Sequence, residues 1–199
     1  MLDYIFLIGP SAVGKTTLAK FLYQHYQGVY LEQNMVPEFA IPEDVEDIGV
    51  YEEKMCWENV LLQLRFFHEK GCRNIVALDF DDYRVRELPM HFQGSRFLIL
   101  RLVSSDTGQI RCQMEHRNTH EGGLYAPDQI ERSNQMIRSR HLLPNERMLD
   151  VAGKSVEEVR KEAMEIIDGF EPLMEYEYEL DEERWYLSWV QSRNKEGDV

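Results

Sequence analysis

The sequence has few cysteines, no long hydrophobic run and a shortage of positive charge. Its cysteines, Cys56, Cys72 and Cys112, are odd in number and lack C-x-x-C spacing, which argues against a disulfide scaffold and a zinc site. Every hydrophobic run is much shorter than the roughly 20 residues that a membrane helix needs. An acid stands at Asp3, where a signal peptide would carry positive charge. We therefore expect reduced thiols and a soluble, cytoplasmic protein without a membrane partner.

The excess of acids also limits the class of ligand. The 199 residues carry a formal net charge of −14. A nucleic-acid-binding surface needs a cationic face to neutralise backbone phosphates, so a nucleic-acid-directed NTPase is disfavoured. The chain is long enough for one sizeable α/β domain and too short for two full domains with a linker. We expect a monomer or homodimer that holds anionic ligands with a few local positive groups.

A phosphate-binding loop is the most specific motif in the chain. Residues 9–16 read Gly-Pro-Ser-Ala-Val-Gly-Lys-Thr, a complete G-x-x-x-x-G-K-[ST] match between an apolar strand-like run and a helix start. Lys15 can span the β- and γ-phosphates, and the Thr16 hydroxyl can hold Mg²⁺. The motif predicts ATP and Mg²⁺ as cofactors. The residues expected at the nucleotide are Gly9, Ser11, Ala12, Val13, Gly14, Lys15, Thr16 and Thr17.

Five apolar runs alternate with helical segments along the chain. The strands are expected at 4–8, 29–31, 74–79, 97–103 and 147–151, and the helices at about 17–26, from Pro42 to Gly71, at 107–117, 127–141 and 156–167. The longer strand runs are continuously apolar, which is typical of strands buried on both faces. The pattern predicts an α/β fold in which a five-stranded parallel sheet carries helices on both faces.

The last 31 residues differ from the rest of the chain. From 169 to 199 there are nine acids and three bases, yet Trp185 and Trp189 stand one helical turn apart. An appended helix that packs on the domain and a tail that binds a partner are both consistent with this composition.

With the loop near the N-terminus, a helical insert after the second strand and an arginine-bearing loop after the fourth, this sequence resembles the small-molecule P-loop kinases. These are the relatives of nucleoside monophosphate kinases, shikimate kinase and gluconate kinase. The resemblance covers residues 4–168 and implies a kinase-like domain at 1–168 followed by an extension at 169–199. It implies that residues 32–73 bind the phosphate acceptor and that residues 117–126 form a lid over the transferring group.

The resemblance also implies roles for basic residues around the lid. Arg117 lies where the lid begins and Arg111 lies on the preceding helix, and an arginine at the transferring phosphoryl group contributes strongly to the rate. Arg138 and Arg140, on the helix that returns from the lid, are further candidates for binding phosphates or an acidic acceptor. Gly153 lies in the loop after the fifth strand, which touches adenine in the family.

Acidic residues are expected on the side of the phosphate-binding loop that lies away from the lid. Asp79 closes the third strand, the position of the Walker B acid that orients Mg²⁺. Asp81 and Asp82 follow, and one of them is expected to act as metal partner or base, although the pair can also simply cap a turn. Glu32 ends the second strand, where family members place an acid that contacts the acceptor.

The sequence does not identify the acceptor. Nucleoside monophosphate kinases carry Asp-Gly-[Phe/Tyr]-Pro-Arg after the third strand, whereas this chain reads Asp-Phe-Asp-Asp-Tyr-Arg at 79–84, with Arg84 or Arg86 left to meet an anion. Phe39 and Trp57 can stack on a ring-shaped acceptor, but such aromatics are more often core residues. The main hypothesis is an ATP- and Mg²⁺-dependent phosphotransferase with a small-molecule acceptor. The alternative is a nucleotide-dependent switch that works through the C-terminal extension.

Overall fold

A five-stranded parallel sheet organises the protein, whose computed structural model describes residues 1–121 and 127–175. The strands are β1 (Tyr4–Ile8), β2 (Tyr30–Glu32), β3 (Ile75–Leu78), β4 (Phe97–Val103) and β5 (Glu146–Asp150). They lie in the order β2-β3-β1-β4-β5, and each neighbouring pair is parallel. The expected α/β sheet is confirmed.

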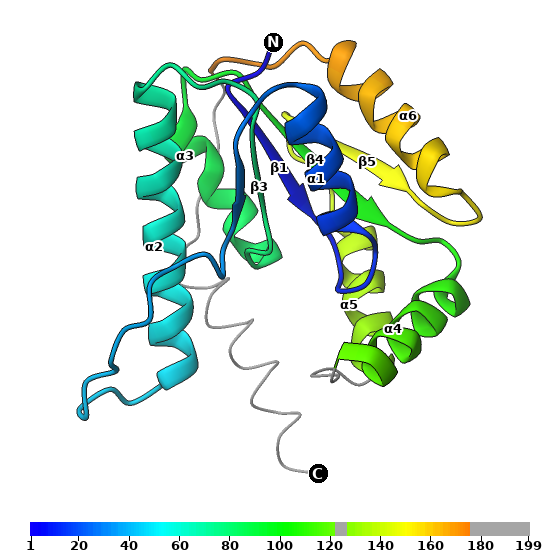
Figure 1. Cartoon of the computed structure of the whole chain (residues 1–199), viewed down its shortest axis with the longest axis horizontal. Helices are drawn as coiled ribbons and strands as arrows, with labels where there is room; N and C mark the ends of the chain where they lie inside the picture. Colours follow the sequence, from blue (N-terminus) through cyan, green and yellow to red (C-terminus); the bar gives the residue numbers. More distant parts are fainter. Residues whose placement is uncertain (122–126, 176–199) are drawn as a thin grey trace.

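Helices cover both faces of this sheet (Figure 1). They are α1 (Lys15–His25), α2 (Ile48–Glu69), α3 (Leu88–Phe92), α4 (Thr107–Glu121), α5 (Pro127–Ser139) and α6 (Val156–Asp168), with a 3-10 helix, η1 (Asp82–Glu87), before α3. The helices α1 and α6 pack on one face, whereas α2 and α3 pack on the other. Two hydrophobic cores therefore lie on either side of one sheet.

Alternation along β1 supplies both cores. Ile5 and Leu7 belong to the core under α1 and α6, whereas Phe6 and Ile8 belong to the core under α2 and α3. All five residues of β1 are buried, as are all seven of β4. This explains the continuous apolar runs, because a strand covered on both faces has no solvent side to mark with polar residues.

Helix ends differ from the sequence expectation at several points. The second helix begins at Ile48 rather than near Pro42, because the Asp47 carboxylate accepts a hydrogen bond of 3.0 Å from the Val50 amide and caps the helix there. The fourth helix continues to Glu121, so the segment expected as a lid loop from 117 begins as helix. The short elements η1 and α3 were not expected. Residues 122–126 of the expected lid and 176–199 of the extension, including both tryptophans, lie outside the described residues.

Two further observations concern membrane-spanning helices and the cysteine thiols. Within residues 1–121 and 127–175, no helix combines the length and apolar character that crossing a membrane requires. Cys56, Cys72 and Cys112 are all free thiols, as expected.

Candidate nucleotide and acceptor site

The phosphate-binding loop joins the carboxyl end of β1 to the start of α1. Gly9 has φ +145°, and a Cβ added there would lie 2.3 Å from the Leu102 carbonyl oxygen, so the loop passes β4 too closely for any side chain. Gly14 has φ +101° and caps α1 without a side-chain hydrogen bond. The helix N-terminus and its amide groups are thus presented to a ligand, an arrangement suited to binding phosphate. Val13 is buried and anchors the loop to the core.

Lys15 is held over this loop by oxygen atoms. Its ammonium group donates to the carbonyl oxygens of Gly9 and Pro10, both at 3.0 Å, and lies 3.4 Å from an Asp79 carboxylate oxygen. The lysine side chain is only 11 % exposed. Pairing of Leu7 with Leu78 explains the approach of Asp79, because it places the residue after β3 level with Ile8, just before the loop. Lys15 and Asp79 are therefore brought together, and Thr16 follows Lys15 in the first turn of α1.

Other acids lie along the same edge of the sheet. Glu32 pairs in register with Leu78, the residue before Asp79, and its carboxylate accepts a hydrogen bond from the Tyr30 hydroxyl. Asp81 caps η1, and its carbonyl oxygen accepts a hydrogen bond of 3.0 Å from the Arg84 amide. The carboxyl ends of β2 and β3 thus carry Glu32, Asp79 and Asp81 next to the phosphate-binding loop.

Asp82 belongs to a different arrangement, because it is bound by Arg140. The guanidinium of Arg140 donates to both oxygens of Asp82, at 2.9 and 3.0 Å, and to both oxygens of Glu146, at 2.7 and 3.0 Å. Burial alone would lower the pKa of Arg140, but the hydrogen bonds with Glu146 and Asp82 outweigh it and raise the pKa above its ordinary value. Arg140 thus connects the segment after β3 to the end of α5.

A fully buried ion pair continues this network into the sheet. Arg101 of β4 and Glu146 of β5 are 1 % and 0 % exposed, and the Arg101 Nε lies 2.8 Å from a Glu146 oxygen. The other nitrogens of Arg101 donate to the carbonyl oxygens of Ile137, Arg140 and His141 at the end of α5. Burial would raise the pKa of Glu146, but hydrogen bonds from Arg101 and Arg140 hold it below its usual value. The pair fixes α5 to the sheet.

A second network fastens α2 to the segment after β3. Arg84 forms two hydrogen bonds with Glu53 of α2, at 2.7 and 3.0 Å, and one of 2.6 Å with Glu87. Glu87 also accepts a hydrogen bond of 2.9 Å from the Trp57 indole. The Tyr83 hydroxyl donates to Glu53, and burial together with this bond raises the pKa of Tyr83. Arg84, expected as an anion ligand, is instead neutralised by two carboxylates.

The aromatic candidates on the insert behave differently from each other. Trp57 is 2 % exposed and packs against Phe80 in the core, with ring centroids 5.3 Å apart, as the core interpretation predicted. Phe39 is 37 % exposed and contacts the Tyr51 ring edge-to-face at 6.4 Å, so the core interpretation is wrong for this residue.

The pair α4 and α5 forms a hairpin at the other end of the site. Asn134 of α5 bonds the backbone of Ser104 twice, at 3.1 and 2.8 Å, and holds the start of the hairpin against β4. Arg111 of α4 binds Asp128 and Glu131 of α5, each at 2.6 Å. The cation expected at the nucleotide therefore connects the two helices in this structure.

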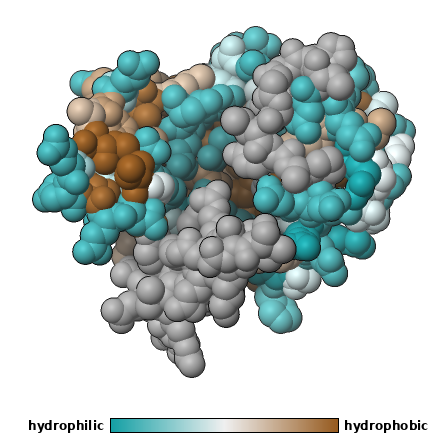
Figure 2. All heavy atoms as spheres, turned by 90° about the horizontal axis from the view of Figure 1, so that it is seen from below, coloured by the Kyte–Doolittle hydropathy of each residue, from teal (hydrophilic) through white to brown (hydrophobic). Residues whose placement is uncertain are grey.

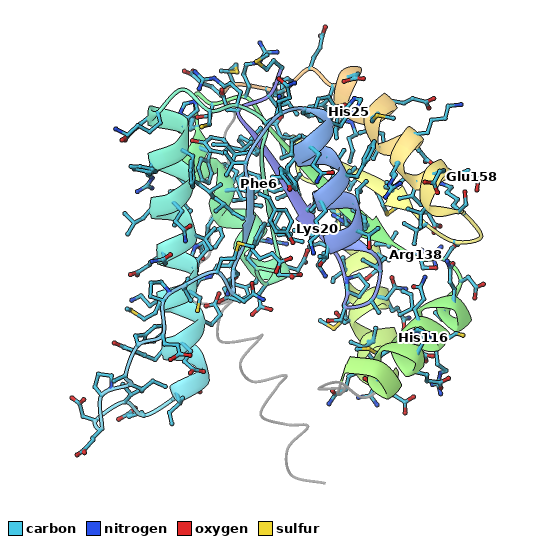
Figure 3. All side chains as sticks on the ribbon, in the orientation of Figure 1. Phe6, Lys20, His25, His116, Arg138 and Glu158 are labelled. Carbon is cyan, nitrogen blue, oxygen red and sulfur yellow. The ribbon has the colours of Figure 1, made fainter. Side chains whose placement is uncertain are left out.

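The remaining predicted residues lie around this hairpin. Gly153, with φ +67°, follows β5, and its amide donates to the Gln109 side chain at 3.2 Å. Arg138 of α5 is exposed, and Figure 3 labels it together with His116 of α4. The backbone of Arg117 belongs to α4, but its side chain lies outside the described residues.

Sequence reasoning missed the two ion networks and the Gln109 contact. One signal was available for the buried pair, because Arg101 interrupts the apolar run 97–103 and Glu146 stands at the start of the fifth strand. A charge inside a buried strand requires an opposite charge nearby. The position of its partner 45 residues later could not be read from spacing.

Comparison with known proteins shows which solved structures share this fold. No protein-family model and no curated protein matches the chain. Among solved structures, a gluconokinase from Sinorhizobium meliloti superposes with a TM-score of 0.55 at 14% identity, over 82% of this chain and 90% of that one. A shikimate kinase from Acinetobacter baumannii in complex with shikimate gives 0.53 at 18% identity, over 84% and 92%. A thymidylate kinase from Candida albicans gives 0.51 at 15% identity, over 83% and 91%.

These three proteins cover most of this chain and differ from one another in what they phosphorylate. At such low identity the likeness concerns the fold. Together with the phosphate-binding loop at the end of β1 and the strand order β2-β3-β1-β4-β5, it shows that this chain has the fold of the small-molecule P-loop kinases.

Proposed function

We propose that the protein is a phosphotransferase that uses ATP and Mg²⁺ to phosphorylate a small-molecule acceptor. One observation carries the proposal: Lys15, nearly buried, lies between the loop carbonyls and Asp79 beside the open N-terminus of α1. Phosphoryl transfer needs little more from a protein than positioned positive charge around the phosphates and an acid near the metal. The fold shared with gluconokinase and shikimate kinase supports this reading.

Each residue near the loop has a role in this proposal. The amides at the start of α1 bind the β-phosphate, and Lys15 exchanges its contacts with the Gly9 and Pro10 carbonyls for oxygens of the transferring phosphate. Thr16 and Asp79 would hold Mg²⁺, which neutralises phosphate charge when it is bound. These oxygen donors fit a hard cation that is bound by one or two protein groups and by substrate phosphates. Arg117 of α4 is proposed to reach the transferring group.

The acceptor is proposed to enter from the side of α2. Glu32 and Asp81, at the ends of β2 and β3, would orient its hydroxyl, and one of them would accept its proton. Arg84 and Arg140, two of the four arginines considered for an acceptor phosphate, are each bound by two carboxylates. This pairing favours a hydroxyl of an uncharged or amine-bearing metabolite over a monophosphate.

A turnover assay with matched lysine variants tests the proposal. ADP production is measured with pools of sugars, nucleosides, nucleotides and amino alcohols, and phosphorylated product is identified by mass spectrometry. Lys15→Ala should lower acceptor-dependent turnover by at least about 10²-fold, because the transferring charge loses its cation. Lys20, labelled on α1 in Figure 3, is exposed on the same helix, and Lys20→Ala should retain full turnover.

Two results would contradict the proposal. One is a Lys15→Ala protein with wild-type turnover. The other is slow ATP hydrolysis that every acceptor pool leaves unchanged, with no phosphorylated product, which is the behaviour of a nucleotide-dependent switch.

A further inference from the structure

The helix α2 exposes a row of large hydrophobic side chains on the face that it turns away from the sheet. Its inner face buries Trp57, Val60, Leu61 and Leu64. The outer row, which we call the α2 stripe, consists of Ile48, Met55, Leu62 and Phe66, which are 56%, 38%, 63% and 53% exposed. These residues take no part in the described cores, so the fold of one copy does not account for them.

The spacing of the stripe makes it continuous along the helix. Ile48, Met55 and Leu62 stand seven residues apart, and Phe66 follows four residues later, which places all of them on one face. An outer helix face normally carries polar residues. In Figure 1, α2 lies at the left margin, and no other described helix or strand lies outside it. Figure 2 views the molecule from below, toward one end of α2, and shows a hydrophobic patch at that end on the side where α2 lies.

We propose that the α2 stripe is the interface of a homodimer, in which α2 packs antiparallel against α2 of a second copy across a two-fold axis. The charges along the helix favour a second copy of the chain as the partner and an antiparallel orientation of the two helices. Residues 48–58 of α2 contain three acids and one base, whereas residues 59–70, up to the C-cap, contain two bases and one acid. A two-fold antiparallel arrangement sets the acidic half of each copy against the basic half of the other, so the surface is complementary to itself. A parallel arrangement would set the two acidic halves together.

Charged residues on both flanks of the stripe fit the same arrangement. With the two-fold axis beside Leu62, Glu58 of one copy lies opposite Arg65 of the other, and Glu52 lies opposite Lys70. All four of these charged side chains are exposed in the single chain. Met55, Leu62 and Phe66 then face the partner's α2, whereas Ile48 lies beyond the end of that helix at Glu69. Asn59 is the polar residue within the stripe, and a polar residue in a helix seam restricts register and oligomeric state. The inference does not depend on the proposed enzymatic function.

The molar mass in solution tests the dimer. Sedimentation equilibrium of the whole chain at tens of micromolar should give twice the chain mass of 23.6 kDa. Leu62→Glu should raise the dissociation constant by on the order of 100-fold or more, because the two-fold axis removes the leucine twice. Met136→Glu is the matched control: Met136 is 62% exposed on α5, and this variant should remain dimeric. Circular dichroism checks that both variants are folded.

Charge reversal and truncation test whether a second copy of α2 covers the α2 stripe. Glu58→Arg should weaken the dimer, and adding Arg65→Glu should restore it, because the pair is exchanged as a unit. A chain that ends at residue 175 should keep the dimer. The proposal is overturned if the wild-type chain is monomeric, if Leu62→Glu leaves the dissociation constant unchanged, or if removal of residues 176–199 abolishes the dimer and so makes that segment the occupant.

Discussion

Replacing Glu146 by glutamine tests how much the buried network of Arg101, Glu146 and Arg140 stabilises the fold. The substitution keeps the size of the side chain and removes its charge. Glu146 accepts hydrogen bonds from both arginines and from the Leu143 amide, and it is 0 % exposed. The variant leaves Arg101, itself 1 % exposed, as a buried cation without an anion. Loss of one partner of a buried pair typically costs about 3 to 5 kcal/mol.

Urea unfolding followed by circular dichroism measures this cost. With an unchanged m value, the free energy of unfolding of Glu146→Gln should fall by about 3 to 5 kcal/mol, a large part of the stability of a typical domain. The control is Glu157→Gln, which removes an acid that is 76 % exposed and paired with Arg160, and it should cost less than about 1 kcal/mol. A loss below about 1 kcal/mol for Glu146→Gln would refute the reasoning, because the attraction within the ion pair would then only offset the cost of removing its charges from water.

The same pair predicts a pH dependence of the difference between wild type and variant. The pKa of Glu146 is lowered in the folded protein relative to the unfolded chain. Its stabilisation is therefore complete above the unfolded pKa and is lost as the pH falls through the folded pKa. The gap between wild type and Glu146→Gln should stay constant near neutral pH and shrink in acid. A gap that grew on acidification would contradict the assignment.

Three further substitutions test the loop and a helix cap. Gly9→Ala should destabilise the protein by more than about 2 kcal/mol, because the new Cβ would meet the Leu102 carbonyl at 2.3 Å. Gly49→Ala is the control: it lies in α2 with its nearest contact at 3.6 Å and should stabilise the protein by about 0.5 to 1 kcal/mol. Equal changes in the free energy of unfolding in urea would exclude the steric explanation. Ser155→Ala should cost about 1 kcal/mol, because Ser155 and Glu158 form a capping box at the start of α6, and an unchanged unfolding midpoint would show that the cap contributes nothing.

Local patterns in the sequence predicted the parts of the fold that depend on local physics. The apolar runs at β1, β3 and β4 indicated strands, because burial on both faces leaves no solvent side to carry polar residues, and Arg101 of β4 is buried with its partner Glu146. The glycines of the loop predicted its turn, and together with Lys15 they are the basis of the proposed phosphate chemistry. The approach of Asp79 to Lys15 followed once a parallel sheet was assumed, because strand ends then meet at one edge.

Interactions between distant segments could not be predicted in the same way. Arg84 and Glu53 are 31 residues apart, and Arg140 and Asp82 are 58 apart, so the periodicity of neither segment indicates the pairing. The start of α2 depended on whether Asp47 or an earlier residue caps the helix, a choice that composition leaves open. The continuation of α4 past Arg117 had no apolar signal, and packing of Ile110 and Met114 against Ile130 of α5 accounts for this hairpin.

The contacts of Lys15 with the loop and with Asp79 have a consequence for ligand selectivity under the proposed function. Its ammonium group has already lost most of its water and is instead surrounded by two carbonyl oxygens and a carboxylate. A ligand that draws the lysine away must replace three oxygen contacts at once, so ligands with weak hydrogen-bond acceptors do not compete for its ammonium group. Under the proposed function, we therefore expect a multiply charged phosphate chain to displace the lysine, and an isolated carboxylate or a neutral ligand to leave it in place.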